Sequence, residues 1–242
     1  MLVIGAQRCG TTYLSAALDA HPQITMARPA RPEPKVFCDD DLAVRGTGWY
    51  HRTWFGHAAD EQVLGDKSTS YLEDPAAPAR AVSMLGNAVH VVAVLRDPVE
   101  RAVSNWRFSS RNGLETRAVE DALLADLTGR RSWDAGTTSV SPYAYLRRGR
   151  YAEYLDPWWS AFGGTTHVLF MEELLTDPAV LTGLVHALGV DPDLVQPPAP
   201  HPLNSSEGSR PVLSRALLGT LKAYFEESNA ALSAQTGRQL PW

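Results

Sequence analysis

The sequence predicts a three-layer α/β fold in which helices flank a mainly parallel central sheet. Segments of strand and helix character alternate along the chain, which is the pattern of parallel strands joined by crossover helices. A glycine-containing loop follows the first strand and precedes the first helix, an order typical of phosphate-binding α/β domains. The 242 residues, 44% hydrophobic and 20% charged, suffice for one sizeable core. We therefore expect a single domain that spans residues 1–242.

The expected elements alternate from the first residues onward. The first strand is expected at Leu2–Ile4 and the first helix at Thr11–Asp19. Residues 63–68 (VLGDKS) are predicted to form a short strand that ends in polar side chains. Residues 88–98 (AVHVVAVLRDP) contain an almost continuous apolar run, which is typical of a strand buried on both faces. Pro29–Gly48 is rich in proline and aspartate, and we expect a long irregular loop there.

Helix signals follow the apolar run and recur later in the chain. Asp97 is suited to the N-cap and Pro98 to the first turn of a helix. Residues 166–175 (THVLFMEELL) are predicted to be a strand that passes into a helix, and residues 214–232 have the periodicity of a long amphipathic helix. Val190–Pro211 holds six prolines and is expected to be a second irregular segment.

Composition limits the classes of partner and the compartment. The formal net charge is −5, so the chain lacks an overall basic field and no nucleic-acid partner is expected. Two cysteines, Cys9 and Cys38, are too few for a disulfide framework, which favours a reducing, cytoplasmic location. The sequence shows no secretion signal and no apolar run of about twenty residues, so no membrane partner is expected. It does not indicate an oligomeric state.

Gly5–Thr12 (GAQRCGTT) has the spacing of a phosphate-binding loop, with four residues between two glycines and two hydroxyl side chains after them. Backbone N–H groups in such a loop point inward, and the next helix adds its positive end. An ATP-binding loop carries lysine where this chain has Thr11, and the basic residue lies inside the loop as Arg8. After the apolar strand the cation Arg96 precedes Asp97, which does not suit magnesium. The seven histidines lack metal-ligand spacing, so no metal is expected.

Four segments together resemble the sulfotransferases that use 3′-phosphoadenosine 5′-phosphosulfate (PAPS). VIGAQRCGTTYLSAAL (3–18) resembles the family's 5′-phosphosulfate loop, and LRDPVERAVSNW (95–106) is similar to its 3′-phosphate motif. GDKSTSYL (65–72) resembles a block that is usually close to GEKSPSYL, and RPEPKVF (31–37) is a looser match to a KEPHFF-like segment with a catalytic glutamate. The likeness is nearest to heparan-sulfate, tyrosylprotein and bacterial members, and it extends to YLRRGRYAEYLDPWW (145–159) and VLFMEELLTDP (168–178).

The resemblance implies a P-loop NTPase-like sulfotransferase fold, PAPS as the cosubstrate and no required metal. It implies catalytic roles for Arg8, Glu33 and Lys67. The expected reaction moves a sulfuryl group from PAPS to a hydroxyl or amine of an acceptor and releases adenosine 3′,5′-bisphosphate. We expect a small-molecule, natural-product or glycoside acceptor. By the same resemblance PAPS is bound by Gln7, Arg8, Cys9, Gly10, Thr11, Thr12, Arg96, Ser104 and Arg210.

The residue types suit this chemistry. Arg96 and Ser104 are eight positions apart, so an arginine at the end of a strand and a serine two turns into the next helix can reach one extra phosphate. Arg8 and Lys67 can neutralise charge that grows on the transferred group, and Glu33 can accept the acceptor's proton. Many members have lysine where this chain has Arg8, and arginine stabilises charge but hardly donates a proton. The segment around Glu33 also lacks the family's usual aromatic and basic neighbours.

Alternatives remain open at this point. A small-molecule kinase would share the loop, and a nucleotide-binding protein that has lost catalysis would share the loop and the fold. Arg96 can instead pair with Glu100, four positions further on. His51 and His57 belong to the aromatic segment WYHRTWFGH, where they either line an acceptor pocket or form part of an ordinary core or surface cluster.

Overall fold

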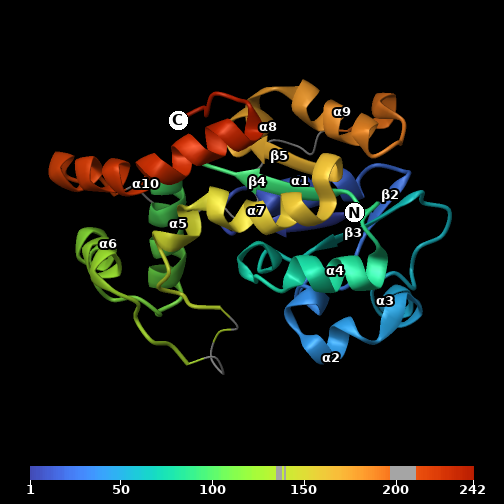
Figure 1. Cartoon of the computed structure of the whole chain (residues 1–242), viewed down its shortest axis with the longest axis horizontal. Helices are drawn as coiled ribbons and strands as arrows, with labels where there is room; N and C mark the ends of the chain where they lie inside the picture. The colour runs from blue at the N-terminus through green and yellow to red at the C-terminus, as the bar shows by residue number, and fades with distance from the viewer. Residues whose placement is uncertain (135–137, 139, 197–210) are drawn as a thin grey trace. The chain divides into compact units, whose positions relative to one another are not determined.

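The computed structural model describes residues 1–134, 138, 140–196 and 211–242. The chain falls into two compact units, each built from two separate segments. Unit 1 comprises Met1–Leu95 and Tyr154–Leu203, and unit 2 comprises Arg96–Glu153 and Asn204–Trp242. Figure 1 shows the elements of both units. The single domain expected from the chain length stays a prediction.

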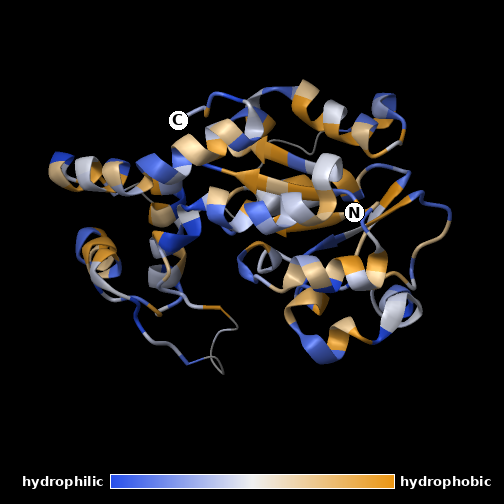
Figure 2. Ribbon diagram, viewed as in Figure 1, coloured by the Kyte–Doolittle hydropathy of each residue, from blue (hydrophilic) through white to orange (hydrophobic). Residues whose placement is uncertain are grey.

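Unit 1 is built on a five-stranded sheet in the order β2-β3-β1-β4-β5, and every neighbouring pair is parallel. Each residue of β4 is buried, as predicted for an apolar strand that is covered on both faces. In Figure 2 the strands are mostly orange, whereas the helices carry both orange and blue residues. The strands are β1 (Leu2–Gly5), β2 (Ile24–Met26), β3 (Val63–Lys67), β4 (Val91–Leu95) and β5 (Thr166–Phe170).

Helices cover both faces of this sheet. On one face Val3, Val92 and Val94 pack against apolar residues of α1, α8 and α9. Because side chains alternate along a strand, Leu2 and Ile4 face the other side, where Figure 1 shows α7 crossing in front of the sheet while α1 lies behind it. The predicted three layers are confirmed. Unit 1 contains α1 (Thr11–Asp19), α2 (Asp40–Ala43), α3 (Gly46–Trp54), α4 (Ala77–Leu85), most of α7 (Tyr151–Phe162), α8 (Met171–Thr176) and α9 (Pro178–Ala187).

The expectation of an irregular segment at Pro29–Gly48 was wrong in part. A 3₁₀ turn (Val36–Cys38), α2 and the start of α3 lie within it. Proline and aspartate suggested a loop, but Asp39 is an N-cap: its Oδ1 accepts a hydrogen bond from the backbone N–H of Leu42 at 3.0 Å. The second segment expected to be irregular falls largely on residues 197–210, outside the described part of the chain.

Unit 2 is helical in its described residues. It contains α5 (Pro98–Arg111), α6 (Val119–Thr128) and α10 (Arg215–Thr236), together with the first turn of α7. Asp97 caps α5 through a 2.7 Å hydrogen bond from the N–H of Val99, as the sequence predicted. The three helices share one apolar core: Val99, Ala102, Val103, Val119, Ala122, Leu123, Leu217, Leu221 and Phe225. Among the described residues of the whole chain, no helix is long and apolar enough to cross a membrane.

A buried carboxylate organises the connection between α5 and α6. Glu115 is fully shielded and accepts hydrogen bonds from the Arg117 guanidinium at 2.7 Å and from the Tyr145 hydroxyl at 3.0 Å. Burial alone would raise the pKa of Glu115, but the hydrogen bonds from Arg117 and Tyr145 outweigh it and lower the pKa to about 2. Glu115 is therefore ionised and paired at neutral pH.

Candidate active site

The predicted phosphate loop connects β1 to α1 in unit 1. At its start the backbone N–H of Ala6 donates to the carbonyl of Val94 at 2.8 Å, which fixes the loop to the neighbouring strand β4. Cys9 is fully buried, and its Sγ donates to the carbonyl of Gln7 at 3.6 Å. Gly10 is the N-cap of α1 and offers no side chain to accept the first N–H groups, and no acidic residue lies in the first turn. This helix end is therefore suited to an anion.

Two residues of the loop have left-handed backbones. Gly10 has φ +84°, which favours glycine, and a Cβ atom there would lie 3.2 Å from Cγ of Met171, so a larger residue would also press on that side chain. Arg8 has φ +68°, a conformation that costs a non-glycine residue on the order of 1 kcal/mol. The surrounding loop thus holds the backbone of Arg8 against its own preference, which is common at functional sites.

Two of the three predicted catalytic residues, Glu33 and Lys67, are brought together in unit 1. Nζ of Lys67 donates to Oε1 of Glu33 at 2.9 Å. The side chain of Lys67 is 12% exposed and that of Glu33 is 17% exposed. The other carboxylate oxygen of Glu33 accepts from the backbone N–H of Thr69 at 2.9 Å and from its hydroxyl at 3.0 Å. A cation and a carboxylate therefore form a shielded pair at the end of β3.

A buried network holds the backbone around this pair. Asp66, fully buried on β3, accepts hydrogen bonds at 2.7 Å from the hydroxyls of Tyr50, Ser68 and Tyr71. Burial raises the pKa of Asp66, and the hydrogen bonds from the three hydroxyls oppose that shift. Oγ of Ser68 also accepts from the backbone N–H of Lys35 at 2.9 Å. The segment that carries Glu33 is thereby tied to the end of β3.

Strand register sets the position of this pair relative to the loop. Val3 of β1 is the register partner of Lys67 in β3, and β1 continues to Gly5, the first residue of the loop. Gly5 is also closely packed, since a Cβ atom there would lie 2.9 Å from Cβ of Leu72. The loop follows the carboxyl end of β1, and Lys67 is the last residue of the parallel strand β3. The loop and the Lys67–Glu33 pair therefore lie at the same end of the parallel strands.

The residues predicted for the 3′-phosphate belong to unit 2. Arg96 directly follows β4 in the chain, its carbonyl accepts from the hydroxyl of Tyr151 at 2.9 Å, and its Nη2 lies 3.5 Å from Oε2 of Glu100. The alternative pairing of Arg96 with Glu100 is thus present, although a partly exposed pair at this distance is weak. Ser104 lies on α5, two turns after Arg96. Arg210 lies outside the described residues.

The two units differ in charge. Unit 1 has 8 basic and 16 acidic residues, whereas unit 2 has 14 basic and 11 acidic residues. The net charge of +3 on unit 2, against −8 on unit 1, is of the sign that an extra phosphate requires. Within the described ranges no three His, Cys, Asp or Glu side chains are grouped to hold a metal ion. The expectation that no metal is required stays a prediction.

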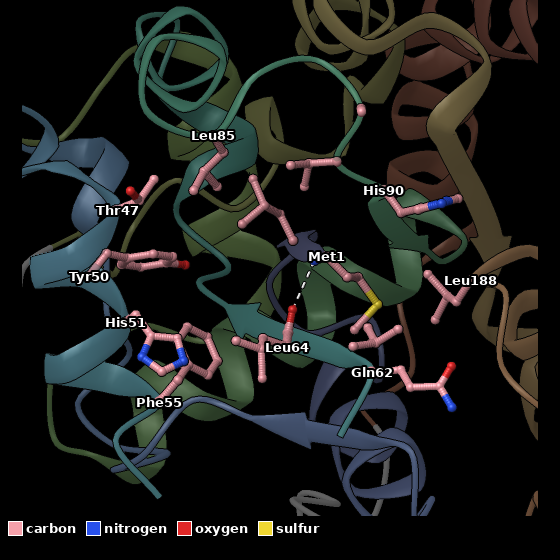
Figure 3. Close-up of a pocket in the computed structure, with 14 residues that line it drawn as sticks. Met1, Thr47, Tyr50, His51, Phe55, Gln62, Leu64, Leu85, His90 and Leu188 are labelled. Atoms are coloured by element: carbon pink, nitrogen blue, oxygen red, sulfur yellow. Dashed lines mark hydrogen bonds between the residues drawn. The ribbon is translucent and has the colours of Figure 1, made fainter. Parts of the chain in front are cut away.

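The two histidines of the aromatic segment have separate surroundings. Nε2 of His57 is 3.1 Å from the Thr25 hydroxyl and 3.1 Å from the Met26 carbonyl, so this ring supports β2. His51 lines a cavity of about 470 Å³ with Tyr50 and other largely apolar residues. Figure 3 shows the cavity at Met1, where β1 begins, which is the opposite end of that strand from the phosphate loop. The structure therefore does not place His51 at the candidate active site.

Sequence reasoning named Asp66 only as an alternative to Glu33 for the base, and it missed Thr69 and the two tyrosines that donate to Asp66. The motif GDKSTSYL contains Asp66 and Thr69, but nothing in it indicates that they contact residues on other segments. Tyr50 lies 16 positions away from Asp66 in the chain. The only available signal was the concentration of hydroxyl side chains after a short strand.

The chain is similar in sequence to proteins of known family. The sequence profile of the family described as "Sulfotransferase domain" matches residues 1–183. Heparan sulfate glucosamine 3-O-sulfotransferase 3A1 of Mus musculus is 27% identical over 264 residues, which cover 100% of this chain and 63% of that protein. Bifunctional heparan sulfate N-deacetylase/N-sulfotransferase 1 of Homo sapiens is 28% identical over 200 residues, or 78% of this chain and 22% of that protein. The chain thus spans less than two thirds of the length of these curated relatives.

Two solved structures are similar in fold. A sulfotransferase from Alicyclobacillus acidocaldarius superposes with a TM-score of 0.77 at 24% identity and covers 99% of this chain and 96% of its own. A sulfotransferase domain from the curacin biosynthetic pathway has a TM-score of 0.53 at 15% identity, with 99% and 98% coverage. These likenesses concern the fold, and with the parallel sheet of unit 1 they confirm the predicted fold class.

Proposed function

Because this chain belongs to the sulfotransferase family, a family of enzymes, we propose that it transfers a sulfuryl group from PAPS to an acceptor hydroxyl or amine. The observation that supports this proposal best is the shielded pair of Lys67 and Glu33 at 2.9 Å. Sulfuryl transfer needs a cation for the charge that grows on the transferred group and a base for the acceptor's proton. The pair offers one of each beside the phosphate loop.

The loop residues Gln7, Arg8, Cys9, Gly10, Thr11 and Thr12 are proposed to hold the 5′-phosphosulfate of the donor. The fit is supported by the N-terminus of α1, where Gly10 provides no capping side chain and the first turn has no acidic residue. When bound, PAPS supplies an activated sulfuryl group and a stable bisphosphate leaving group. Arg96, Ser104 and Arg210 are proposed to contact its 3′-phosphate, a role supported by the family motif and by the net positive charge of unit 2.

In the proposed step Glu33 takes the proton from the acceptor as its O–H or N–H bond breaks. The acceptor's electron pair forms the new bond to sulfur. The bond between sulfur and the 5′-phosphate oxygen breaks, and its electrons leave with adenosine 3′,5′-bisphosphate. Lys67 and Arg8 stabilise the negative charge on the sulfuryl and bridging oxygens, as fixed cations suffice for this charge without a metal.

For the acceptor we propose a small molecule, a natural product or a glycoside. Two of the relatives are named for heparan sulfate, one of them specifically for a glucosamine 3-O-position, and these names support a glucosamine-containing saccharide in an acceptor panel. We also propose a cytoplasmic protein without a nucleic-acid or membrane partner. The low cysteine content, Cys9 and Cys38 alone, and the net charge of −5 support this part of the proposal.

Two alternatives are less well supported. A kinase loop would carry lysine where this chain has Thr11. A binding protein without catalytic activity would have no need of a buried cation and carboxylate beside the loop, yet Lys67 and Glu33 form such a pair. We therefore keep sulfuryl transfer as the proposed activity.

The test is turnover of PAPS with a panel of phenols, aminosugars and glucosamine-containing oligosaccharides, followed by mass spectrometry of the acceptor. We expect a sulfated product that also forms in EDTA. Glu33→Gln should lower turnover by about 10²–10⁴-fold, because the amide keeps the shape but cannot accept the proton. Phosphorylated product that requires ATP and magnesium would favour the kinase. Tight binding of adenosine 3′,5′-bisphosphate without turnover of any acceptor would favour the inactive binding protein.

A further inference from the structure

The carboxylate of Glu33 is held from two sides. Thr69 donates both its backbone N–H, at 2.9 Å, and its hydroxyl, at 3.0 Å, to Oε2. Lys67 donates to Oε1 at 2.9 Å. Each carboxylate oxygen has about two lone-pair directions, so Thr69 occupies those of Oε2. The remaining acceptor position of the group is on Oε1, the oxygen that faces Lys67.

The backbone position of Glu33 has a support of its own. The N–H of Lys35, two residues further on, donates to Oγ of Ser68 at 2.9 Å, and Ser68 donates to the buried Asp66 at 2.7 Å. Removal of the Thr69 hydroxyl should therefore leave the segment around Glu33 in place. What it should change is the rotation of the carboxylate about its terminal bond, which is a broad torsion without such contacts.

At Thr69 this chain departs from the block that it resembles. The related block usually reads GEKSPSYL, in which proline stands at the position of Thr69. Proline has neither a backbone N–H nor a hydroxyl, so it cannot make either of the two hydrogen bonds to Oε2. The role of Thr69 therefore does not follow from membership of the family.

We propose that Thr69 is the positioning residue of the base: it fills Oε2 of Glu33 and directs Oε1 to the acceptor's proton. This inference rests on the proposed function, because it needs Glu33 to act as the base. Proton transfer then forms the O–H bond on Oε1, beside Lys67. Thr69 itself does not touch the reacting atoms and acts through the carboxylate.

The kinetic test compares Thr69→Val with Thr69→Ser. Valine keeps the branched shape and the N–H but lacks the hydroxyl, whereas serine keeps both donors. We expect Thr69→Val to lower kcat by about 5–20-fold with KM for PAPS unchanged, since an orientation is lost and donor binding is not. The acidic limb of its kcat–pH profile should move to higher pH, because a carboxylate with fewer hydrogen-bond donors takes up a proton more readily. Thr69→Ser should restore the limb to its wild-type position.

Controls separate this role from a general loss of structure. Thr182→Val removes a hydroxyl of the same kind on α9, where it donates to the Pro178 carbonyl at 3.1 Å, and it should leave kcat and the pH profile unchanged. If Thr69→Val does not fold, Thr69→Ala replaces it, and we expect the same fall in kcat and the same shift of the acidic limb. An unmoved acidic limb in a folded, active Thr69→Val enzyme would overturn the proposal, and so would a serine variant that behaves like valine.

A second measurement does not depend on turnover. The amide proton of Thr69 in an NMR spectrum should move upfield in Glu33→Gln, since its acceptor loses a full negative charge. An unchanged Thr69 resonance would show that the contact is absent in solution and would overturn the inference. Failure of the proposed function is distinguishable, because in that case the wild-type protein sulfates no acceptor whatever the NMR result.

Discussion

The hydroxyl of Tyr50 lies 2.7 Å from Oδ2 of Asp66. Tyr50 lines the cavity at the amino ends of the strands (Figure 3), whereas Asp66 directly precedes Lys67 on β3. One hydrogen bond thus connects the wall of that cavity to the strand that carries the candidate catalytic lysine. Because Asp66 is fully buried, it depends on such donors for the stability of its charge.

Tyr50→Phe removes one donor from this carboxylate without changing the ring. We expect the free energy of unfolding to fall by about 1–3 kcal/mol, because a buried acceptor loses a hydrogen bond. Urea denaturation would measure the change. Tyr71→Phe, which removes the second phenol on the same oxygen, should cost a similar amount, and the double variant should be non-additive. Changes below about 0.5 kcal/mol in both single variants, the usual effect of surface substitutions, would contradict this account of Asp66.

Glu115 predicts a dependence of stability on pH. Its pKa of about 2 in the folded protein is below the ordinary 4.5, so its stabilising contribution is complete above about pH 4.5 and is lost as the pH falls toward 2. Glu115→Gln should lower the free energy of unfolding by about 1–3 kcal/mol at neutral pH. The difference from wild type should shrink on acidification. Glu227→Gln, at a side chain that is 88% exposed, is the matched control and should change little at any pH; a constant deficit for Glu115→Gln would contradict the assignment.

Arg96→Ala and Ser104→Ala should each weaken binding of adenosine 3′,5′-bisphosphate. Charge-assisted hydrogen bonds to one phosphate are worth about 1.5–3 kcal/mol, whereas adenosine 5′-phosphosulfate, which lacks that phosphate, should bind nearly as before. Calorimetry with both nucleotides checks this. Arg111→Ala, an exposed residue at the end of α5, serves as a control for the loss of one positive charge. An equal loss of affinity for both nucleotides would remove the assignment to the 3′-phosphate.

Arg8→Ala should lower turnover more than it weakens nucleotide binding, because the guanidinium is expected to meet charge that appears only as the bond to the leaving group breaks. The loss of one such donor costs on the order of 10²–10³ in rate. Arg8→Lys should recover part of the activity, since a compact ammonium does not reproduce the guanidinium fork. Stopped-time assays of product at saturating PAPS provide the measurement, with Arg28→Ala, 54% exposed, as the control. Normal turnover in Arg8→Ala would show that Arg8 has no catalytic role. Lys67 alone would then have to stabilise the charge on the leaving group.

Local signals predicted much of the fold. The expected first helix coincides with α1 (Thr11–Asp19), and the Asp97 cap begins α5 as expected. The three-residue strand β2 and the helix α2 were not found, because a strand this short has little periodicity and α2 depends on one capping side chain, Asp39. The composition of Pro29–Gly48 indicated a loop, but capping and tertiary packing favour helix in part of it.

The candidate site was predicted only in its separate parts. The motifs identified Lys67 and Glu33, but their contact joins residues 34 positions apart in the chain. That contact relies on a backbone donor, the N–H of Lys35, and a buried hydroxyl, Ser68, and backbone donors leave no trace in a sequence pattern. The same limit hid Thr69, half of whose interaction with Glu33 comes from its main chain.

The register of β1 has a consequence for insertions and deletions. Val3 is the partner of Lys67 on one side and of Val92 on the other, and Gly5 then pairs with Ala93, so β1 already holds one residue more than β4 just before the phosphate loop. One added residue between Leu2 and Gly5 would move the loop by about 3.3 Å along β3 and turn the apolar side chains to the wrong faces. An apolar replacement of similar volume should be tolerated there. We therefore expect changes in the number of residues in β1 to be tolerated less well than apolar replacements of its side chains.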